Sequence, residues 1–370
     1  MKNEWYHIVD IDKIDSPALV VYHERVAQNI STLVSMIDDL KRLRPHAKTF
    51  KSKEAASLLI NSGVNKFKCA TIAEAEMLAM TDARDVLLAY QPTGPKLKRF
   101  LELIKKYPST KFSCLVDNTS SAEEISSASF ESGIQMPVYI DLNVGMNRTG
   151  IEPGTAAVEL YRACEKLNGT KPIGLHAYDG HIRNPGLNER TIECDKAFKP
   201  VFDMQQSLLQ EGFAEPIIVA GGSPTFPVHA ARKNIECSPG TFIYWDLGYQ
   251  RSFKEQKFLT AALVITRVVS LPGKRKICLD LGHKSIAAEN NLDNRVCFLN
   301  APALKFISQS EEHLVVETAN DHSYNLGDVF YGLPVHICPT VALYERAFVI
   351  ENNKLSGEWK TIARDRKIDI

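Results

Sequence analysis

Stretches of alternating polar and apolar positions recur along the first two thirds of the chain, with amphipathic runs between them. Short apolar runs bounded by turn residues predict strands, and apolar positions three and four residues apart predict helices. The strands expected here cover residues 44–49, 66–70, 86–89, 112–116, 138–142, 173–177, 217–220 and 235–243. They follow one another at roughly 20–40 residues, which is typical of strand–helix units.

The amphipathic runs predict helices over residues 72–80, 95–106, 121–132 and 155–167. About eight strand–helix units predict an α/β fold, with a (β/α)8 barrel over residues 24–244. An open doubly wound sheet is the alternative. No G-x-G-x-x-G segment follows an early strand, so a dinucleotide site is not favoured.

The pattern changes after about residue 244, where short apolar runs alternate with turn signals such as Pro272-Gly273 and Asn352-Asn353. These runs cover 260–269, 275–281, 303–307, 314–318, 335–338 and 347–351. They predict a mainly β second domain formed by residues 245–370. We expect residues 1–23 to join it, because the apolar run 18–22 precedes the first barrel helix and can pair with that sheet.

Composition excludes several classes of partner. The chain has 370 residues with 44 acidic and 44 basic side chains, so no global field attracts nucleic acid or a membrane surface. We find no apolar stretch of bilayer-spanning length and no basic-then-apolar leader pattern, and therefore expect a cytoplasmic protein. The eight cysteines show no paired spacing, which is typical of free thiols.

Lys48 is the first candidate for chemistry, because it lies near the C-terminal end of the strand expected at 44–49. Barrel enzymes carry their reactive groups at that end of their strands. A lysine that is partly removed from water loses its proton more readily and can form a Schiff base. Position alone does not separate this role from that of a solvated surface lysine.

Arg148 is the second candidate, in the segment Gly145-Met146-Asn147-Arg148-Thr149-Gly150 directly after the strand expected at 138–142. Its glycines permit tight turns, and the arginine would project into the barrel mouth. A guanidinium there can hold a phenolate oxygen or a carboxylate. A surface salt bridge is the alternative for the same residue.

Two glycine-containing turns, Gly221-Gly222-Ser223-Pro224-Thr225 and Ser238-Pro239-Gly240-Thr241, follow or lie within the last two expected barrel strands. Backbone N–H groups and hydroxyls at that place often bind a phosphate, although plain structural turns explain the pattern equally well. No lysine completes a P-loop, so a nucleoside triphosphate is not expected.

His336-Ile337-Cys338 is the last candidate, within the β domain. Residues two apart on a strand point to the same face, so imidazole and thiolate can reach one metal ion. This ligand pair favours zinc. A core histidine beside a buried cysteine is the commoner meaning of such a spacing.

These motifs, in this order, together with Pro334-Val335-His336-Ile337-Cys338-Pro339-Thr340, resemble the D-threonine aldolase and D-serine dehydratase family of pyridoxal-phosphate enzymes. The resemblance covers nearly the whole chain, from Ser16 to Trp359. It implies an alanine-racemase-type barrel with a β domain, a homodimer, and sites built where the two domains of different subunits meet.

The resemblance also implies roles for single residues. Lys48 matches the lysine that binds the cofactor covalently, Arg148 the arginine on the cofactor's 3′-oxygen, and Tyr178 the ring that stacks on the pyridine. Ser223, Thr225, Gly240 and Thr241 match the phosphate site, and His336 with Cys338 matches the metal pair. We expect zinc there, with manganese or magnesium as alternatives.

Three positions depart from the family pattern. Phe50 stands where a histidine is usual, and Cys338 where aldolases more often carry a carboxylate. Ser238 replaces the arginine that racemases place against the pyridine nitrogen, which disfavours simple racemisation.

The function implied is a lyase whose small-molecule substrates are D-3-hydroxy amino acids, with the metal assisting at the β-hydroxyl. Lys48 would be the catalytic base for dehydration. His176 and His181 are candidate bases for aldol cleavage, and a structural role is the alternative for each. An amino-acid racemase and a non-catalytic carrier of pyridoxal phosphate are the alternatives. Nucleic acid and membranes are not expected as partners.

Overall fold

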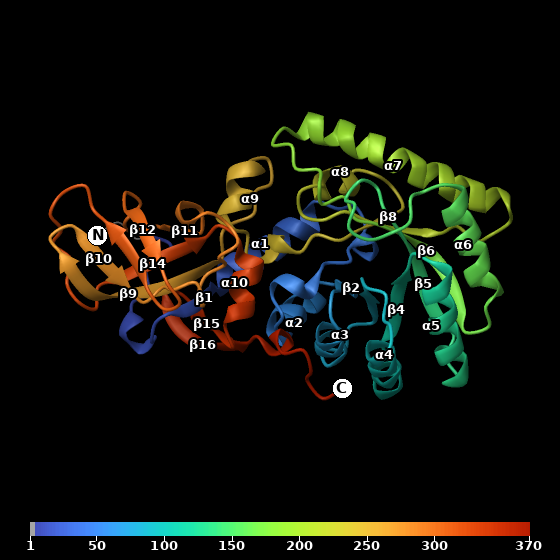
Figure 1. Ribbon diagram of the computed structural model, residues 1–370, viewed down its shortest axis with the longest axis horizontal. Helices are drawn as coiled ribbons and strands as arrows, with labels where there is room; N and C mark the ends of the chain where they lie inside the picture. Colours follow the sequence, from blue (N-terminus) through green and yellow to red (C-terminus); the bar gives the residue numbers. More distant parts are fainter. Residues whose placement is uncertain (1–3) are drawn as a thin grey trace. The chain divides into compact units, whose positions relative to one another are not determined.

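The structure is a computed structural model that describes residues 4–370 (Figure 1). The chain forms two compact units. The barrel unit contains residues 33–48, 55–240 and 365–370, and the β unit contains residues 4–32, 49–54 and 241–364. Each unit has its own sheet.

The barrel unit is built on seven parallel strands that follow the chain order from β2 to β8. Helices cover the outer face of this sheet, as α3 to α6 show in Figure 1. The strands are β2 (Lys66–Cys69), β3 (Asp85–Leu88), β4 (Lys111–Val116), β5 (Met136–Leu142), β6 (Thr170–Ala177), β7 (Ile217–Ala220) and β8 (Ile235–Cys237). The helices are α3 (Ile72–Ala79), α4 (Pro95–Lys106), α5 (Thr119–Glu131), α6 (Thr155–Lys166), α7 (Leu187–Gln210) and α8 (Phe226–Ala230).

The short segment 43–46 lies between β8 and β2 and closes the sheet on itself; we call it the seam. It makes two isolated parallel bridges, Leu43 with Cys237 and His46 with Lys68. Three backbone hydrogen bonds of 2.9 Å hold it, in which Arg44 N donates to Cys237 O, His46 N to Pro239 O, and Lys68 N to Pro45 O.

The prediction of a regular strand over residues 44–49 is therefore wrong. Pro45 has no N–H to donate, and after His46 the chain turns into the 3₁₀ helix η3 (Ala47–Thr49). The strand expected at 235–243 is likewise too long, because β8 ends at Cys237 and the 3₁₀ helix η4 (Thr241–Ile243) follows.

The register identifies the side chains that face the barrel interior. Paired residues of parallel strands point to the same face, and Asp141 pairs with His176, which pairs with Val219. Lys68 pairs with Leu87. Leu87 and Val219 form one buried apolar cluster with Leu115 and Tyr139. Lys68, Asp141 and His176 therefore share the interior with this apolar layer.

Arg44 anchors an ionic cluster in the barrel unit. Its side chain is fully buried, its Nε lies 2.6 Å from Glu236 Oε2, and its Nη1 lies 2.6 Å from Asp85 Oδ1. Lys66 completes the cluster through a second ion pair with Glu236. Burial opposes the charge of Arg44, but Glu236, Tyr139 and Asp85 outweigh it and raise the pKa of the guanidinium.

The β unit contains a nine-stranded, mostly antiparallel sheet. Its strands are β1 (Ala18–Tyr22), β9 (Ala262–Gly273), β10 (Lys276–Leu279), β11 (Val296–Phe298), β12 (Lys305–Gln309), β13 (Leu314–Glu317), β14 (Val329–Pro334), β15 (Arg346–Glu351) and β16 (Lys354–Lys360). The apolar run at 18–22 pairs antiparallel with β9 and parallel with β15, as the sequence predicts. Val20, Leu263, Ile265 and Ile350 belong to its core.

The remaining helices are α1 (His23–Ser35), α2 (Lys53–Asn61), α9 (Leu247–Ser252) and α10 (Ile337–Leu343), and short 3₁₀ turns occupy Ile11–Lys13, Leu40–Arg42, Leu292–Asn294 and Ile362–Arg364. Within residues 4–370, no helix has both the length and the apolar character needed to cross a bilayer.

We predict that Arg44→Met lowers the free energy of unfolding by about 3–5 kcal/mol, because Glu236 and Asp85 then lose their shared buried cation. Arg162→Met is the matched control, since Arg162 pairs with Glu211 at the surface. Arg162→Met should lower the free energy of unfolding by about 1 kcal/mol or less. Urea denaturation followed by circular dichroism measures both. Equal, small losses in the two variants would contradict a structural role for the cluster.

Candidate active site

Lys48 lies in η3, directly after the seam, and is partly buried. Its backbone N–H donates to His46 Nδ1 at 3.2 Å, which fixes the turn that follows the seam. Its Nζ lies 5.9 Å from the centre of the Tyr178 ring. The lysine thus reaches the carboxyl end of the barrel strands through a 3₁₀ turn rather than through the strand end expected from the sequence.

Arg148 and Tyr178 meet at the same place. The guanidinium carbon of Arg148 lies 4.9 Å from the centre of the Tyr178 ring, and Tyr178 directly follows β6. The arginine loop is shaped by Asn143, whose Oδ1 accepts hydrogen bonds from the backbone of Gly145 at 3.1 Å and Asn147 at 3.0 Å. Lys48 and Arg148 therefore face one aromatic ring.

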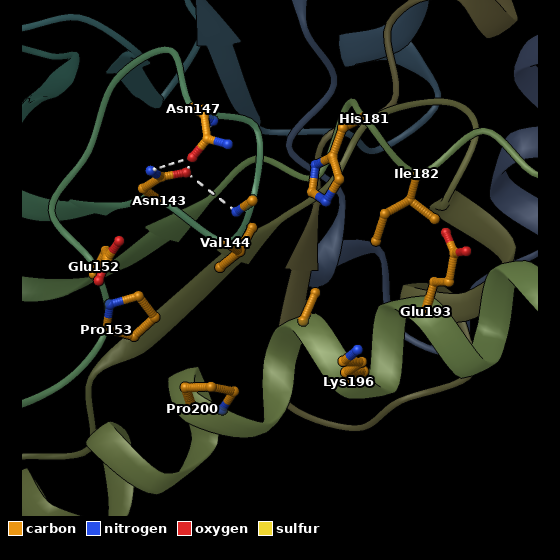
Figure 2. A pocket seen from close by; sticks show the side chains of 12 residues that line it. Asn143, Val144, Asn147, Glu152, Pro153, His181, Ile182, Glu193, Lys196 and Pro200 are labelled. Atoms are coloured by element: carbon orange, nitrogen blue, oxygen red, sulfur yellow. Dashed lines mark hydrogen bonds between the residues drawn. The ribbon is translucent and has the colours of Figure 1, made fainter.

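A cavity of about 560 Å³ opens beside this loop. Figure 2 shows His181 projecting between the loop that carries Asn143 and Asn147 and helix α7, which carries Glu193 and Lys196. The imidazole packs tightly on the arginine loop, because a Cβ at Gly145, where φ is +117°, would lie 2.7 Å from His181 Nε2. His181 therefore lines open space and also supports the loop.

The two glycine-containing turns contact each other through Ser223. Gly240 N donates to Ser223 Oγ at 3.1 Å, and Ser223 is 4% exposed. Thr225 points elsewhere, since its hydroxyl donates to Asp179 Oδ1 at 2.8 Å. Thr241 belongs to the β unit, where its Oγ1 lies 3.7 Å from Cys338 Sγ. Ser223 and the Gly240 backbone thus come together, whereas Thr225 acts through Asp179.

A buried network lies behind Thr225, and no motif in the sequence indicates it. Asp179 Oδ2 lies 2.7 Å from His229 Nε2, and Arg232 Nη1 lies 3.0 Å from His229 Nδ1. Because the arginine can only donate, His229 carries its proton on Nε2 and donates it to Asp179. Burial raises the pKa of Asp179, but His229 and Thr225 outweigh it and lower the pKa below its usual value.

Asp179, His229 and Cys194 also form a group whose ligand atoms are close enough to hold a metal ion. The carboxylate and the imidazole already satisfy each other, however. Burial, and secondly Asp179, raise the pKa of the Cys194 thiol to about 12, which opposes the thiolate that a metal needs. The network is better suited to holding Thr225 and its loop in place.

Ser238 provides a test of whether pyridoxal phosphate suits this site. It is 3% exposed, and its Oγ has no hydrogen-bond partner among the described residues. A buried hydroxyl without a partner is costly and suggests a missing ligand atom. Together with Lys48, Arg148, Tyr178 and Ser223, it supplies groups suited to the cofactor's aldehyde, phenolate oxygen, ring and phosphate, so these residues fit the group.

His336 and Cys338 do not lie on a strand, contrary to the prediction. β14 ends at Pro334, His336 caps α10, and Cys338 lies in its first turn, where Pro339 needs no hydrogen-bond partner. Asp246 Oδ2 accepts from Ile337 N at 3.1 Å and secures this helix start. The two side chains still interact with each other.

The surroundings of His336 suit a cation. Its Nδ1 lies 2.5 Å from Glu289 Oε1, which leaves Nε2 as the ring nitrogen for a metal. Burial lowers the pKa of His336, but Cys338 and Glu289 outweigh it and raise the pKa to about 9. A carboxylate on the second ring nitrogen is the usual support of a metal-binding histidine, so His336 and Cys338 fit a divalent metal.

Lys68, His176 and Asp141 form a second interior group, which no spacing in the sequence brings together. His176 Nδ1 lies 2.7 Å from Asp141 Oδ1, and Lys68 Nζ lies 3.4 Å from His176 Nε2. His176 is therefore engaged on both ring nitrogens. Burial and secondly Lys68 lower its pKa against the effect of Asp141, so the ring is neutral at pH 7, with its proton directed at Asp141.

Comparison with known proteins defines the class. Residues 21–247, more than half of the chain, match the model of the alanine racemase N-terminal domain, so the chain belongs to this family. Residues 261–350 match the model of a putative serine dehydratase domain. The expected family and the expected alanine-racemase-type fold are both confirmed.

The chain is similar over nearly its whole length to several aldolases. A D-threonine aldolase of Arthrobacter sp. is 26% identical over 95% of this chain and 93% of its own length. A 3-hydroxy-D-aspartate aldolase of Paracoccus denitrificans strain Pd 1222 is 24% identical over 97% and 94%. The solved structure of a D-threonine aldolase from Filomicrobium marinum has a TM-score of 0.87 at 24% identity, over 95% and 96% of the two chains.

We predict that Gly221→Ala weakens the binding of pyridoxal phosphate about tenfold or more. Gly221 has φ +68°, and an added Cβ would lie 2.6 Å from Thr225 Oγ1 and 2.7 Å from His229 Cδ2. Such strain costs on the order of 1–3 kcal/mol. Absorbance titration of the apoprotein measures the affinity.

Gly212→Ala is the matched control, because Gly212 has φ +87° but nothing within 4 Å of the added Cβ. It should leave the affinity for the cofactor unchanged. If both variants bind the cofactor as tightly as the parent protein, the turn at Gly221 does not form part of the phosphate site.

Proposed function

We propose that the protein is a pyridoxal-phosphate-dependent lyase that acts on D-3-hydroxy amino acids with the help of a divalent metal. The observation that carries this proposal is the convergence of Lys48 and Arg148 on the Tyr178 ring, at 5.9 Å and 4.9 Å. The relatives named D-threonine aldolase and D-threo-3-hydroxyaspartate dehydratase support the same class.

Under this proposal, each residue of the barrel site binds a different part of the cofactor. Lys48 binds the cofactor through its amine, Arg148 holds the 3′-oxygen, and Tyr178 packs on the ring. Ser223 and the Gly240 backbone would bind the phosphate, and the Ser238 hydroxyl would be available to the pyridine nitrogen. When bound, pyridoxal phosphate withdraws electrons from the bond that breaks at the substrate's α-carbon.

His336 and Cys338 hold the metal, and Glu289 orients the imidazole through Nδ1. A divalent metal supplies Lewis acidity toward a hydroxyl oxygen. Because one ligand is a thiolate, we propose zinc. One solved structure of the related dehydratase is a metal-free form of a variant that replaces a cysteine by alanine.

The bond broken at the α-carbon decides the reaction. Lys48, freed by the substrate, can remove the α-proton, and loss of the β-hydroxyl then gives dehydration. Removal of the hydroxyl proton by a base gives aldol cleavage instead, and His181 lines the cavity where such a base is needed. His176 is less suited to that task, because both of its ring nitrogens are engaged.

We also propose a homodimer, on the ground of the family resemblance. Sedimentation equilibrium of the holoprotein tests it. A mass near twice 41.3 kDa is expected, and a monomeric mass at all concentrations would oppose it.

We predict that incubation of the holoprotein with D-threonine yields either glycine with acetaldehyde or 2-oxobutanoate with ammonia. Lys48→Ala should lose at least about a thousandfold in kcat, since it removes both the attachment point and the proposed base. Lys41→Ala, at an exposed position of the same unit, is the control and should retain activity. The epimer as sole product would indicate a racemase, and no product with any β-hydroxy D-amino acid would indicate a carrier.

We predict that thorough chelation abolishes lyase activity while the visible absorbance of the bound cofactor persists. Glu289→Gln should weaken metal affinity about 10–100-fold, because it removes the support of the His336 ring. Glu311→Gln, which alters an exposed pair with Lys284, is the control. Metal titration with activity as readout measures both variants. Full activity in metal-free protein would exclude the metal role.

A further inference from the structure

Lys68 is an unusual residue for the interior of a barrel. It lies on β2, is 2% exposed, and shares the inner face with Leu87 of the next strand. Burying the charged form of a lysine costs free energy unless a partner compensates for the lost hydration. It has no carboxylate in direct contact among the described residues, and its polar side-chain neighbour is the neutral ring of His176 at 3.4 Å.

Lys68 and the proposed cofactor lysine lie near the same aromatic ring. Its Nζ is 5.8 Å from the centre of the Tyr178 ring, and the Nζ of Lys48 is 5.9 Å from the same centre. The backbone also brings the two lysines near each other. Lys68 forms a parallel β-bridge with His46 of the seam, and Lys48 comes two residues after His46. Two amines therefore converge on the ring against which the cofactor would pack.

The surroundings of Lys68 allow both its ammonium form and its neutral amine form. Burial, and secondly the charge of Lys48, lower the pKa of Lys68 to about 7, while Asp179 and Asp141 oppose this effect. The charged and titratable groups around it are Arg44, Lys48, Asp141, Arg148, His176, Tyr178 and Asp179. Near neutral pH a substantial share of Lys68 is a free amine, which can accept a proton.

We propose that Lys68 is the proton acceptor that prepares Lys48 to capture the cofactor, and that His176 and Asp141 hold it in place. This inference rests on the proposed function. The neutral Lys68 amine takes one proton from the Lys48 ammonium. Lys48 Nζ then forms its bond to the aldehyde carbon of the cofactor, one water leaves, and Lys68 returns the proton to the Lys48 nitrogen.

His176 and Asp141 act as positioning residues in this scheme. The imidazole Nε2 accepts a hydrogen bond from Lys68 in either protonation state, because its Nδ1 proton is directed at Asp141. The carboxylate lies on the far side of the imidazole and stabilises the added positive charge. The positive charge is thereby balanced without a direct ion pair that would fix Lys68 in its protonated form.

The test follows cofactor capture rather than turnover. Apoprotein is mixed with pyridoxal phosphate in a stopped-flow instrument, and the rate of the visible absorbance change is recorded from pH 5.5 to 10. In the parent protein the rate should rise through about pH 7. In Lys68→Met this rise near pH 7 should be lost. The rate at pH 7 should fall at least about tenfold.

Lys68→Arg separates proton transfer from simple charge. An arginine stays charged and cannot accept a proton, so it too should be slow at pH 7 if Lys68 acts as the acceptor. Capture by Lys68→Arg at the parental rate would overturn the proposal, because charge alone would then suffice. An unchanged pH profile in Lys68→Met would overturn it as well.

Two further measurements separate proton transfer from a loss of site structure and from a failure of the proposed function. Pyridoxamine phosphate has no aldehyde, so its affinity should be unchanged in both variants; an equal loss of its binding would overturn the proposal by showing a structural role. Borohydride reduction of the parent holoprotein and peptide mass analysis should locate the cofactor on Lys48. Absence of modified Lys48 would defeat the proposed function itself, whereas modified Lys48 with a parental profile in Lys68→Met defeats only this inference.

Discussion

The three backbone hydrogen bonds that hold the seam fix the segment from which Lys48 projects. They join the last strand of the sheet to the first through a segment too short to form a ladder of its own. Lys48 is the second residue beyond this segment, so its position depends on the seam. Arg44, whose backbone takes part in the seam, also gathers Glu236 and Asp85 in the interior. One segment thus supports both the fold and the candidate site.

Much of the fold could be predicted because its causes are local. Strand–helix alternation, turn residues and the change of pattern after residue 244 indicate a barrel-type unit and a β unit, and the pairing of 18–22 with the later sheet follows from its apolar run. The seam could not be predicted, because alternation at 44–49 resembles a strand. Only Pro45 indicates that the hydrogen bonds must stop.

The candidate site was predictable where residues follow strands closely. Arg148 and Tyr178 come soon after β5 and β6, and parallel strands bring their carboxyl ends together. His336 and Cys338 do lie together, but a helix start rather than the expected strand is the cause. Asp179 and His229 lie fifty residues apart, and no spacing rule joins them.

Lys68 cannot be recognised as an interior residue from its local sequence, because Lys66-Phe67-Lys68-Cys69 looks like a strand with lysines facing water. In a closed barrel this alternation has the opposite meaning: Phe67 and Cys69 are buried on one face, and the lysines occupy the other, inner face. Whether an alternating strand exposes its polar residues depends on closure of the sheet, which is a property of the whole unit.

The seam has a further consequence for the protein before it takes up its cofactor. A junction held by a few hydrogen bonds opens at a lower free energy than a full ladder between strands. Any ligand that binds only the closed form shifts this opening equilibrium by mass action. Under the proposed function, a cofactor attached to Lys48 would be such a ligand. The apoprotein should then exchange amide hydrogens around residues 43–46 faster than the protein with bound cofactor. The cofactor would then stabilise the closed form of the barrel in addition to taking part in the reaction.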